Sequence, residues 1–228
     1  PSTSVALIFA SQILHGFFYG SSEVNDLTIT AGAKSTVIEA GSGNDTITDN
    51  FGFANIHGGA GNDTITGVND TIIFGGYGDD ILIGGRVQGG DGADTMTGTN
   101  YYSVLTYENS LNAVTVNLAD GTGSGGEAAG DTFTNFRNFV GSDHGDNITA
   151  GGTFRSYTLG DGDDTVIGSY KNEYIYSSLG TDIMDGAGNS TSDNPADLMN
   201  FQFGDTVTYT RSNAGINVDL STGSASGG

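Results

Sequence analysis

The chain has 228 residues, of which 39 are glycine, 27 are acidic and only 6 are basic, so its formal net charge at pH 7 is -21. This charge argues against nucleic acid and anionic membrane surfaces as partners, because both are themselves negative. The absence of cysteine excludes disulfides and thiolate metal sites, and a hydrophobic fraction of 36% is low for a conventional globular core.

Residues 1–39 open with an apolar stretch that polar side chains interrupt. Ser11, Gln12 and His15 divide it, and no basic region precedes it. A membrane-spanning helix needs about 20 consecutive apolar residues, so we expect neither membrane insertion nor a signal peptide here. We interpret residues 1–39 as a capping segment that covers the end of a repeat stack.

Residues 40–98 and 141–185 carry a nine-residue pattern, G-G-x-G-x-D-x-U-x, in which U is apolar. In every copy an Asp at position 6 precedes the apolar residue at position 8 by two residues. The clean copies begin at Gly58, Gly75 and Gly89, and the looser ones at Ala40, Gly141, Leu159 and Ser177. A fixed apolar position argues against a disordered acidic linker and predicts stacked repeats.

This nonapeptide resembles the repeats-in-toxin (RTX, hemolysin-type) family of secreted and surface bacterial proteins. The resemblance implies an all-β fold, a right-handed parallel β-roll with short antiparallel strand insertions. In that family the first six residues of each copy form a turn and the last three a strand. Several Ca²⁺ ions, the implied cofactor, lie between turns stacked one coil apart.

The implied metal ligands are the position-6 carboxylates and the main-chain carbonyls of the glycine-rich turns. Ca²⁺ prefers about 6 to 8 hard oxygen ligands, and turns without Cβ atoms let carbonyls converge on it. The carboxylates are those of Asp45, Asp63, Asp80, Asp94, Asp146, Asp164 and Asp182. The glycines are Gly41, Gly43, Gly58, Gly59, Gly61, Gly75, Gly76, Gly78, Gly89, Gly90, Gly92, Gly160 and Gly162.

The apolar position-8 residues are expected to form a narrow inward ladder. They are Ile47, Ile65, Leu82, Met96, Ile148, Val166 and Met184. Successive position-6 aspartates lie 18 or 17 residues apart, which is one coil, but Asp94 follows Asp80 by only 14. The half-turns between copies lack the pattern, and Arg155 and Lys171 lie in two of them, so calcium is expected along one edge of each roll.

Residues 99–140 read as a strand-rich connecting block. Residues 104–107 and 114–118 alternate apolar and polar side chains. Residues 103–126 align without gaps with residues 205–228 at an offset of 102, so residues 186–228 are expected to start a further repeat unit that is truncated. The chain is therefore interpreted as a fragment of a larger protein.

No metalloprotease, esterase or nucleotide-binding motif is present, so we expect no catalytic site in this piece. The leading hypothesis is a calcium-binding structural or adhesive module of a secreted or surface-layer protein, exported by type I secretion and folding outside the cell. The alternative is the accessory module of a secreted protease, lipase or epimerase. Calcium is the expected partner, and self-assembly and surface glycan contact stay open. Ice or glycan binding by a flat face ranks low, because the third positions vary (Ser42, Ala60, Tyr77, Asp91).

Overall fold

A computed structural model describes residues 26–31, 36–151, 156–168, 174–177, 179–180, 182–185, 206–209, 217–219 and 224–226. The chain divides into two compact units, which are described separately. Unit 1 comprises residues 1–105 and 128–136, and unit 2 comprises residues 106–127 and 137–228.

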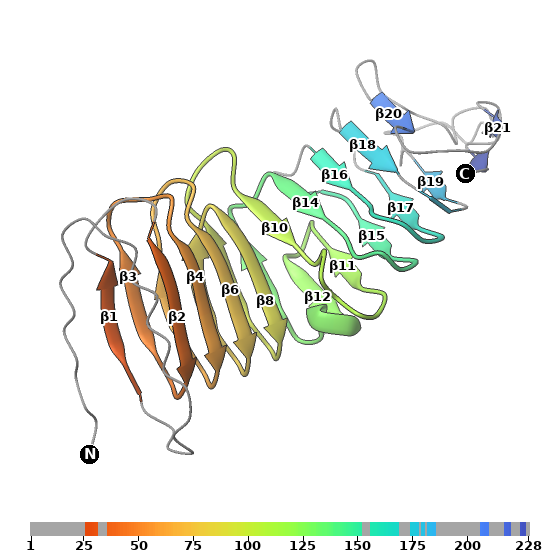
Figure 1. Ribbon diagram of the computed structural model, residues 1–228. Helices are drawn as coiled ribbons and strands as arrows, with labels where there is room; N and C mark the ends of the chain where they lie inside the picture. The colour runs from red at the N-terminus through yellow and green to blue at the C-terminus, as the bar shows by residue number, and fades with distance from the viewer. Residues whose placement is uncertain are drawn as a thin grey trace. The chain divides into compact units, whose positions relative to one another are not determined.

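Unit 1 is a parallel roll in which successive strands alternate between two sheets (Figure 1). One sheet has the order β1 (Thr28–Ala31), β3 (Thr46–Asp49), β5 (Thr64–Thr66), β7 (Ile81–Gly84), β9 (Thr95–Gly98), β13 (Thr132–Thr134). The other has the order β2 (Val37–Ser42), β4 (Asn55–Ala60), β6 (Ile72–Tyr77), β8 (Arg86–Asp91), β10 (Val104–Thr106). All these pairings are parallel.

The core of unit 1 lies between its two sheets, and each sheet contributes one row of side chains to it. In the first sheet Ile47, Ile65, Leu82, Met96 and Phe133 follow one another in register, all at most 3% exposed. The facing row in the second sheet consists of Ile38, Ile56, Ile73, Val87 and Leu105. Burying one such side chain stabilises a fold by about 1.5–3 kcal/mol, so each coil adds only a little to the core.

Unit 2 has the same two-sheet architecture with shorter strands. One sheet has the order β12 (Thr122–Ser124), β11 (Thr115–Asn117), β15 (Asn147–Thr149), β17 (Thr165–Ile167), β19 (Ile183–Asp185), and the other β14 (Asn138–Val140), β16 (Ser156–Thr158), β18 (Tyr174–Ser177), β20 (Thr206–Tyr209). Val116, Ile148 and Val166 form the inward row of the first sheet, and Phe139, Tyr157 and Ile175 that of the second.

The all-β parallel roll predicted from the nonapeptides is confirmed, as are the antiparallel insertions. Antiparallel pairing joins β11 to β12 and β21 (Asn217–Asp219) to β22 (Ser224–Ser226). In the described residues the helical element is a single 3-10 turn, η1 (Gly126–Ala128), and no helix is long and apolar enough to cross a membrane.

The 102-residue internal repeat is visible in the register of these hairpins. Thr115 pairs with Ser124 in the first hairpin, and Asn217 pairs with Ser226 in the second, so both partners shift by 102. The roll also includes residues that the sequence placed in the capping segment, because β1 pairs with β3. The remainder of that segment, residues 1–25 and 32–35, lies outside the described residues, as do Arg155, Lys171 and the Met184 side chain.

Candidate metal sites

The position-6 aspartates of unit 1 form a ladder of side-chain to main-chain hydrogen bonds. The main-chain N–H of Asp45 donates to Oδ1 of Asp63 at 2.7 Å, and the N–H of Asp63 donates to Oδ1 of Asp80 at 2.7 Å. The N–H of Asp80 donates in turn to Oδ1 of Asp94 at 2.8 Å. Each carboxylate is 1% exposed, so the ladder fixes a row of buried acidic groups one coil apart.

Unit 2 repeats this ladder. The main-chain N–H of Asp146 donates to Oδ1 of Asp164 at 2.8 Å, and the N–H of Asp164 donates to Oδ1 of Asp182 at 3.0 Å. These three aspartates are at most 3% exposed. The seven sequence-predicted carboxylates therefore lie at equivalent places in their coils, four in unit 1 and three in unit 2.

The second oxygen of these carboxylates is buried and accepts no hydrogen bond in several coils. This holds for Oδ2 of Asp45, Asp63, Asp80 and Asp164. A buried polar atom without a partner costs about 1–3 kcal/mol, and more when it carries charge. Four such atoms at the same position of the repeat indicate that a ligand with positive charge belongs there.

The surroundings of Oδ2 are clearest at Asp80 and Asp63. A Cβ placed on Gly75 would collide with Oδ2 of Asp80 and would lie 2.5 Å from the carbonyl oxygen of Gly89. A Cβ on Gly58 would likewise collide with Oδ2 of Asp63 and would lie 2.7 Å from the carbonyl oxygen of Gly75. Each Oδ2 thus shares a small space with a carbonyl oxygen of the next coil. Neither oxygen can donate, so a cation would satisfy both.

Burial raises the pKa of these carboxyl groups, because it takes them out of water and so disfavours their charged form. Desolvation is the largest cause and raises the pKa of Asp63 to about 6, that of Asp80 to about 7 and that of Asp164 to about 8. Hydrogen bonds from the main chain oppose the rise, and repulsion from neighbouring carboxylates adds to it. A hard cation would favour the charged form, and this donor set of carboxylate and carbonyl oxygens fits Ca²⁺.

The sequence-predicted glycines lie in these turns, and at several of them the close stacking of coils leaves no room for a side chain. At Gly76 φ is 123°, and a Cβ there would collide with the carbonyl oxygen of Gly59. At Gly78 φ is 117°, and a Cβ would collide with the carbonyl oxygen of Gly61. A side chain at either place would strain the backbone and separate the coils. The other glycines with positive φ among the predicted set are Gly41, Gly43, Gly59, Gly61, Gly90, Gly92, Gly160 and Gly162.

A second ladder, which was not predicted from the sequence, runs along position 5. The N–H of Asn62 donates to Oδ1 of Asn44 at 2.7 Å, and the N–H of Asp79 donates to Oδ1 of Asn62 at 3.1 Å. The N–H of Ala93 donates to Oδ1 of Asp79 at 2.9 Å. These bonds point from each coil to the preceding one, opposite to the position-6 ladder. The recurrence of Asn or Asp at position 5 was the signal that could have revealed it.

The short interval before Asp94 does not displace it from the ladder. Residues 50–54 join β3 to β4, whereas Gly85 alone joins β7 to β8. The four missing residues therefore come from the turn on the other edge, and the Asp94 turn keeps its register with that of Asp80.

Asp131 extends the unit 1 ladder beyond the predicted set. Its Oδ1 accepts the N–H of Asp94 at 2.8 Å, and its side chain is 1% exposed. Asp131 lies two residues before the buried Phe133, which is the spacing of the nonapeptides. That spacing could have identified it, but the turn before it lacks the paired glycines.

Asp146 differs from Asp45, Asp63, Asp80 and Asp164 because both of its oxygens accept hydrogen bonds. Its Oδ2 accepts the N–H of Ser142 at 2.8 Å, and its Oδ1 accepts the Ser142 hydroxyl at 2.7 Å and the N–H of Val114 at 2.8 Å. Ser142 stands where the clean copies have their second glycine. The protein itself therefore satisfies this carboxylate.

No group of three or more His, Cys, Asp or Glu side chains that could hold a metal occurs in the part of the chain that the structure describes. His57 stacks on Phe74 with ring centroids 4.5 Å apart, and its Nε2 lies 3.9 Å from Oε1 of Glu39. Metal binding in these turns would accordingly depend on isolated carboxylates combined with main-chain carbonyls.

Comparison with protein families supports the same turns. The family model described as RTX calcium-binding nonapeptide repeat (4 copies) matches residues 30–52, 50–72, 69–87, 86–100 and 158–190. Neither the curated proteins nor the solved structures gave a significant match.

Proposed function

We propose that this chain, in which residues 30–100 and 158–190 match the RTX calcium-binding nonapeptide repeat family, is a non-enzymatic structural or adhesive module of a secreted or cell-surface bacterial protein. It folds when calcium binds outside the cell. The observation that carries the proposal is the row of buried carboxylate oxygens without hydrogen bonds, of which those of Asp63 and Asp80 lie beside the first glycine of their own turns.

Calcium would be held between turns that are one coil apart. We assign Oδ2 of Asp63 and Asp80 as ligands, together with carbonyl oxygens of the glycine arms such as that of Gly89. The same role extends to Asp45, Asp94, Asp164 and Asp182. The ion supplies positive charge that the turns lack, and the chain supplies a rigid oxygen-lined space and closely stacked coils.

We assign Asp146 a structural role and not that of a calcium ligand, because both of its carboxylate oxygens accept hydrogen bonds from Ser142. In this proposal the ion that the sequence placed between the turns of Asp146 and Asp164 depends on Asp164. One edge of each roll then carries the metal, as the sequence led us to expect.

An extracellular location follows from the linkage between metal binding and folding. A ligand that binds only the folded state stabilises it in proportion to the logarithm of its concentration, so calcium would stabilise the roll far more outside the cell than in the cytosol. A net charge of -21 on a narrow core opposes folding before export. Outside the cell, the folded module would contact surface glycans or further copies of the parent protein.

Calcium titration of the chelator-treated chain by isothermal calorimetry tests the proposal. We expect several calcium ions to bind per chain and magnesium to bind far more weakly, because a rigid carbonyl-rich space suits the larger ion. The Asp63→Asn/Asp80→Asn variant should bind fewer ions. Binding of one ion or none by the wild type, or equal stoichiometry in the variant, would contradict the proposal.

A further inference from the structure

The edge of unit 1 opposite the aspartate ladder is built from three loops that lie side by side. These loops, residues 50–54, 67–71 and 99–103, each lead from the first sheet of unit 1 to the second. A Cβ on Gly52 would lie 3.0 Å from Nδ2 of Asn69, and the carbonyl oxygen of Asn69 accepts Nδ2 of Asn100 at 3.0 Å. The one-residue turn at Gly85 leaves room for the third loop to reach the second.

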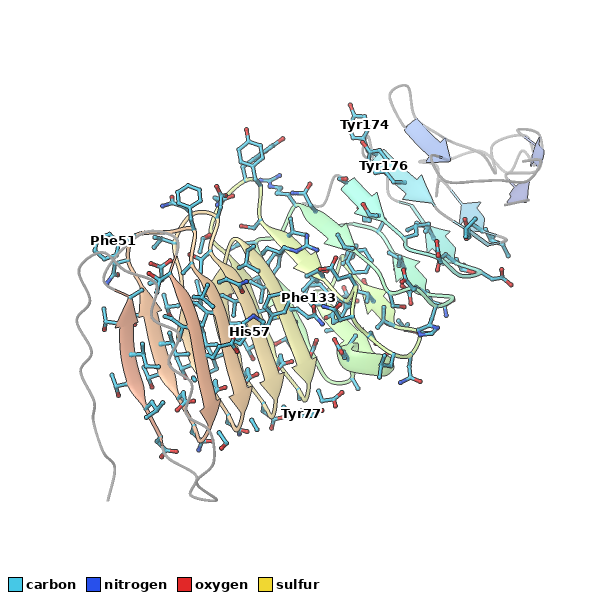
Figure 2. All side chains as sticks on the ribbon, viewed as in Figure 1. Phe51, His57, Tyr77, Phe133, Tyr174 and Tyr176 are labelled. Atoms are coloured by element: carbon cyan, nitrogen blue, oxygen red, sulfur yellow. The ribbon has the colours of Figure 1, made fainter. Side chains whose placement is uncertain are left out.

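Four aromatic side chains project from this edge, and together we call them the aromatic ridge. Phe51 is 44% exposed, Phe53 49%, Tyr101 49% and Tyr102 74%. Figure 2 shows Phe51 at one end of the strands and Tyr77, in a glycine-rich turn, at the other end. Large apolar side chains that remain exposed add little to the core, so their place on one edge of a strongly acidic chain points to a contact.

Phe53 supplies a second, independent observation. Its φ is 64°, a left-handed conformation that a bulky residue rarely adopts because it strains the backbone. In the neighbouring loop Asn69 has a similar φ of 53°, and Asn tolerates this region well. An aromatic ring is thus kept at a strained and half-exposed position where Asn would fold at lower cost. Strain of this kind is typical of binding sites.

We propose that the aromatic ridge binds an uncharged polysaccharide. Flat aromatic rings offer faces against which the C–H faces of sugar rings pack, and exposed amides such as that of Asn50 can both donate and accept hydrogen bonds to hydroxyls. The net charge of -21 disfavours acidic polymers. The inference rests on the surface role proposed above and not on the calcium ligands, which lie on the other edge.

The shape of the ridge also favours an extended polymer over a protein partner. Protein interfaces concentrate their binding energy in central, desolvated pockets, whereas these rings lie in two pairs on loops 50–54 and 99–103, with loop 67–71, which has no aromatic residue, between them. The loops of Phe51 and Tyr101 are three coils apart, roughly 14 Å at the usual strand spacing, which accommodates several consecutive sugar rings.

Affinity electrophoresis of the calcium-loaded chain tests the inference, with dextran, laminarin, xylan and galactomannan as neutral probes and alginate as the acidic one. We expect retardation by at least one neutral polysaccharide. The Phe51→Ala/Tyr102→Ala variant should bind about tenfold more weakly or worse, since it loses one aromatic face from each of the two loops. Tyr174→Ala, which removes a ring of similar exposure from β18, is the matched control and should bind as the wild type does.

Phe53→Asn separates a binding role from a structural one. It should weaken binding while leaving the melting temperature unchanged or higher, because the backbone strain is relieved. Equal affinity in the ridge variants, retardation by alginate alone, no retardation by any probe, or a self-association in ultracentrifugation that the ridge variants abolish would each overturn the inference. Circular dichroism of the same samples with and without calcium tests the proposed calcium function separately.

Discussion

Replacing Asp80 with Asn is expected to stabilise the fold in the absence of calcium and to destabilise it in its presence. Asp80 is 1% exposed, and its Oδ2 has no hydrogen bond and lies in the same small space as the carbonyl oxygen of Gly89. Asn keeps the Oδ1 that accepts the N–H of Asp63 and adds a donor that can bond to a carbonyl. Asp79→Asn, one residue earlier and exposed, is the matched control.

The size of each effect follows from the burial of the charge. Burial raises the pKa of Asp80 from 3.8 to about 7, and one pKa unit corresponds to about 1.4 kcal/mol, so its charged form costs on the order of 4 kcal/mol above pH 8. Removing that charge should recover a large part of this amount without calcium. With calcium, the loss of a charged ligand to a buried ion should cost about 3–5 kcal/mol.

Two unfolding measurements at pH 8 check the prediction. In calcium, the denaturant midpoint of Asp80→Asn should fall well below that of the wild type. In chelator, where trimethylamine N-oxide is added to induce folding, the variant should fold at a lower osmolyte concentration than the wild type. Asp79→Asn should stay within about 0.5 kcal/mol of the wild type in both. Destabilisation of Asp80→Asn under both conditions, or behaviour like that of Asp79→Asn, would refute the reasoning.

Three further predictions concern the effect of pH, the replacement of Gly75 and the replacement of Asp146. Because the folded-state pKa values of Asp80 and Asp164 are raised to about 7 and about 8, their stabilising contribution in chelator is present at low pH and lost as the pH rises through these values. The chelated chain should therefore gain β-sheet circular dichroism from pH 8 to pH 5, and a flat profile would count against the buried charges. Gly75→Ala should lower both calcium stoichiometry and melting temperature, because its Cβ would fill the space beside Asp80 Oδ2, and normal calorimetric stoichiometry would argue against that space as the site. Asp146→Asn should keep the calcium stoichiometry and lose about 0.5–1.5 kcal/mol for each weakened Ser142 bond, whereas Asp164→Asn should lose calcium, and equal calorimetric titrations would disprove the distinction.

The sequence predicted the roll because one physical rule repeats in it. Each nonapeptide has an apolar residue two places after its Asp, as at Ile65 and Leu82, and this fixed position predicts an inward-pointing side chain on every strand. The structure places Ile65 and Leu82 next to each other in one buried row. The family pattern likewise located the turns, since positive φ at Gly76 is a local requirement that a sequence can reveal.

The details of the candidate sites depended on contacts between coils, which the period alone does not contain. A count of residues could not say whether the short interval before Asp94 falls on the metal edge or on the opposite one. The hydrogen bonds to Asp146 depend on the hydroxyl and N–H of Ser142 reaching its carboxylate, and Asp131 joins the ladder from a position 37 residues after Asp94. Both are three-dimensional facts that a one-coil repeat does not encode.

Far-UV circular dichroism of the chelator-treated chain, followed during calcium addition at neutral pH, shows whether the roll folds only when calcium binds. Without calcium we expect the chain to lack most of its β-sheet signal, because buried carboxylates with no counter-charge oppose folding and each sheet contributes only one row of side chains to the core. The signal should appear cooperatively as calcium is added and should not appear with magnesium at the same concentration. A full β-sheet spectrum in chelator, unchanged by calcium, would show that the fold does not depend on calcium.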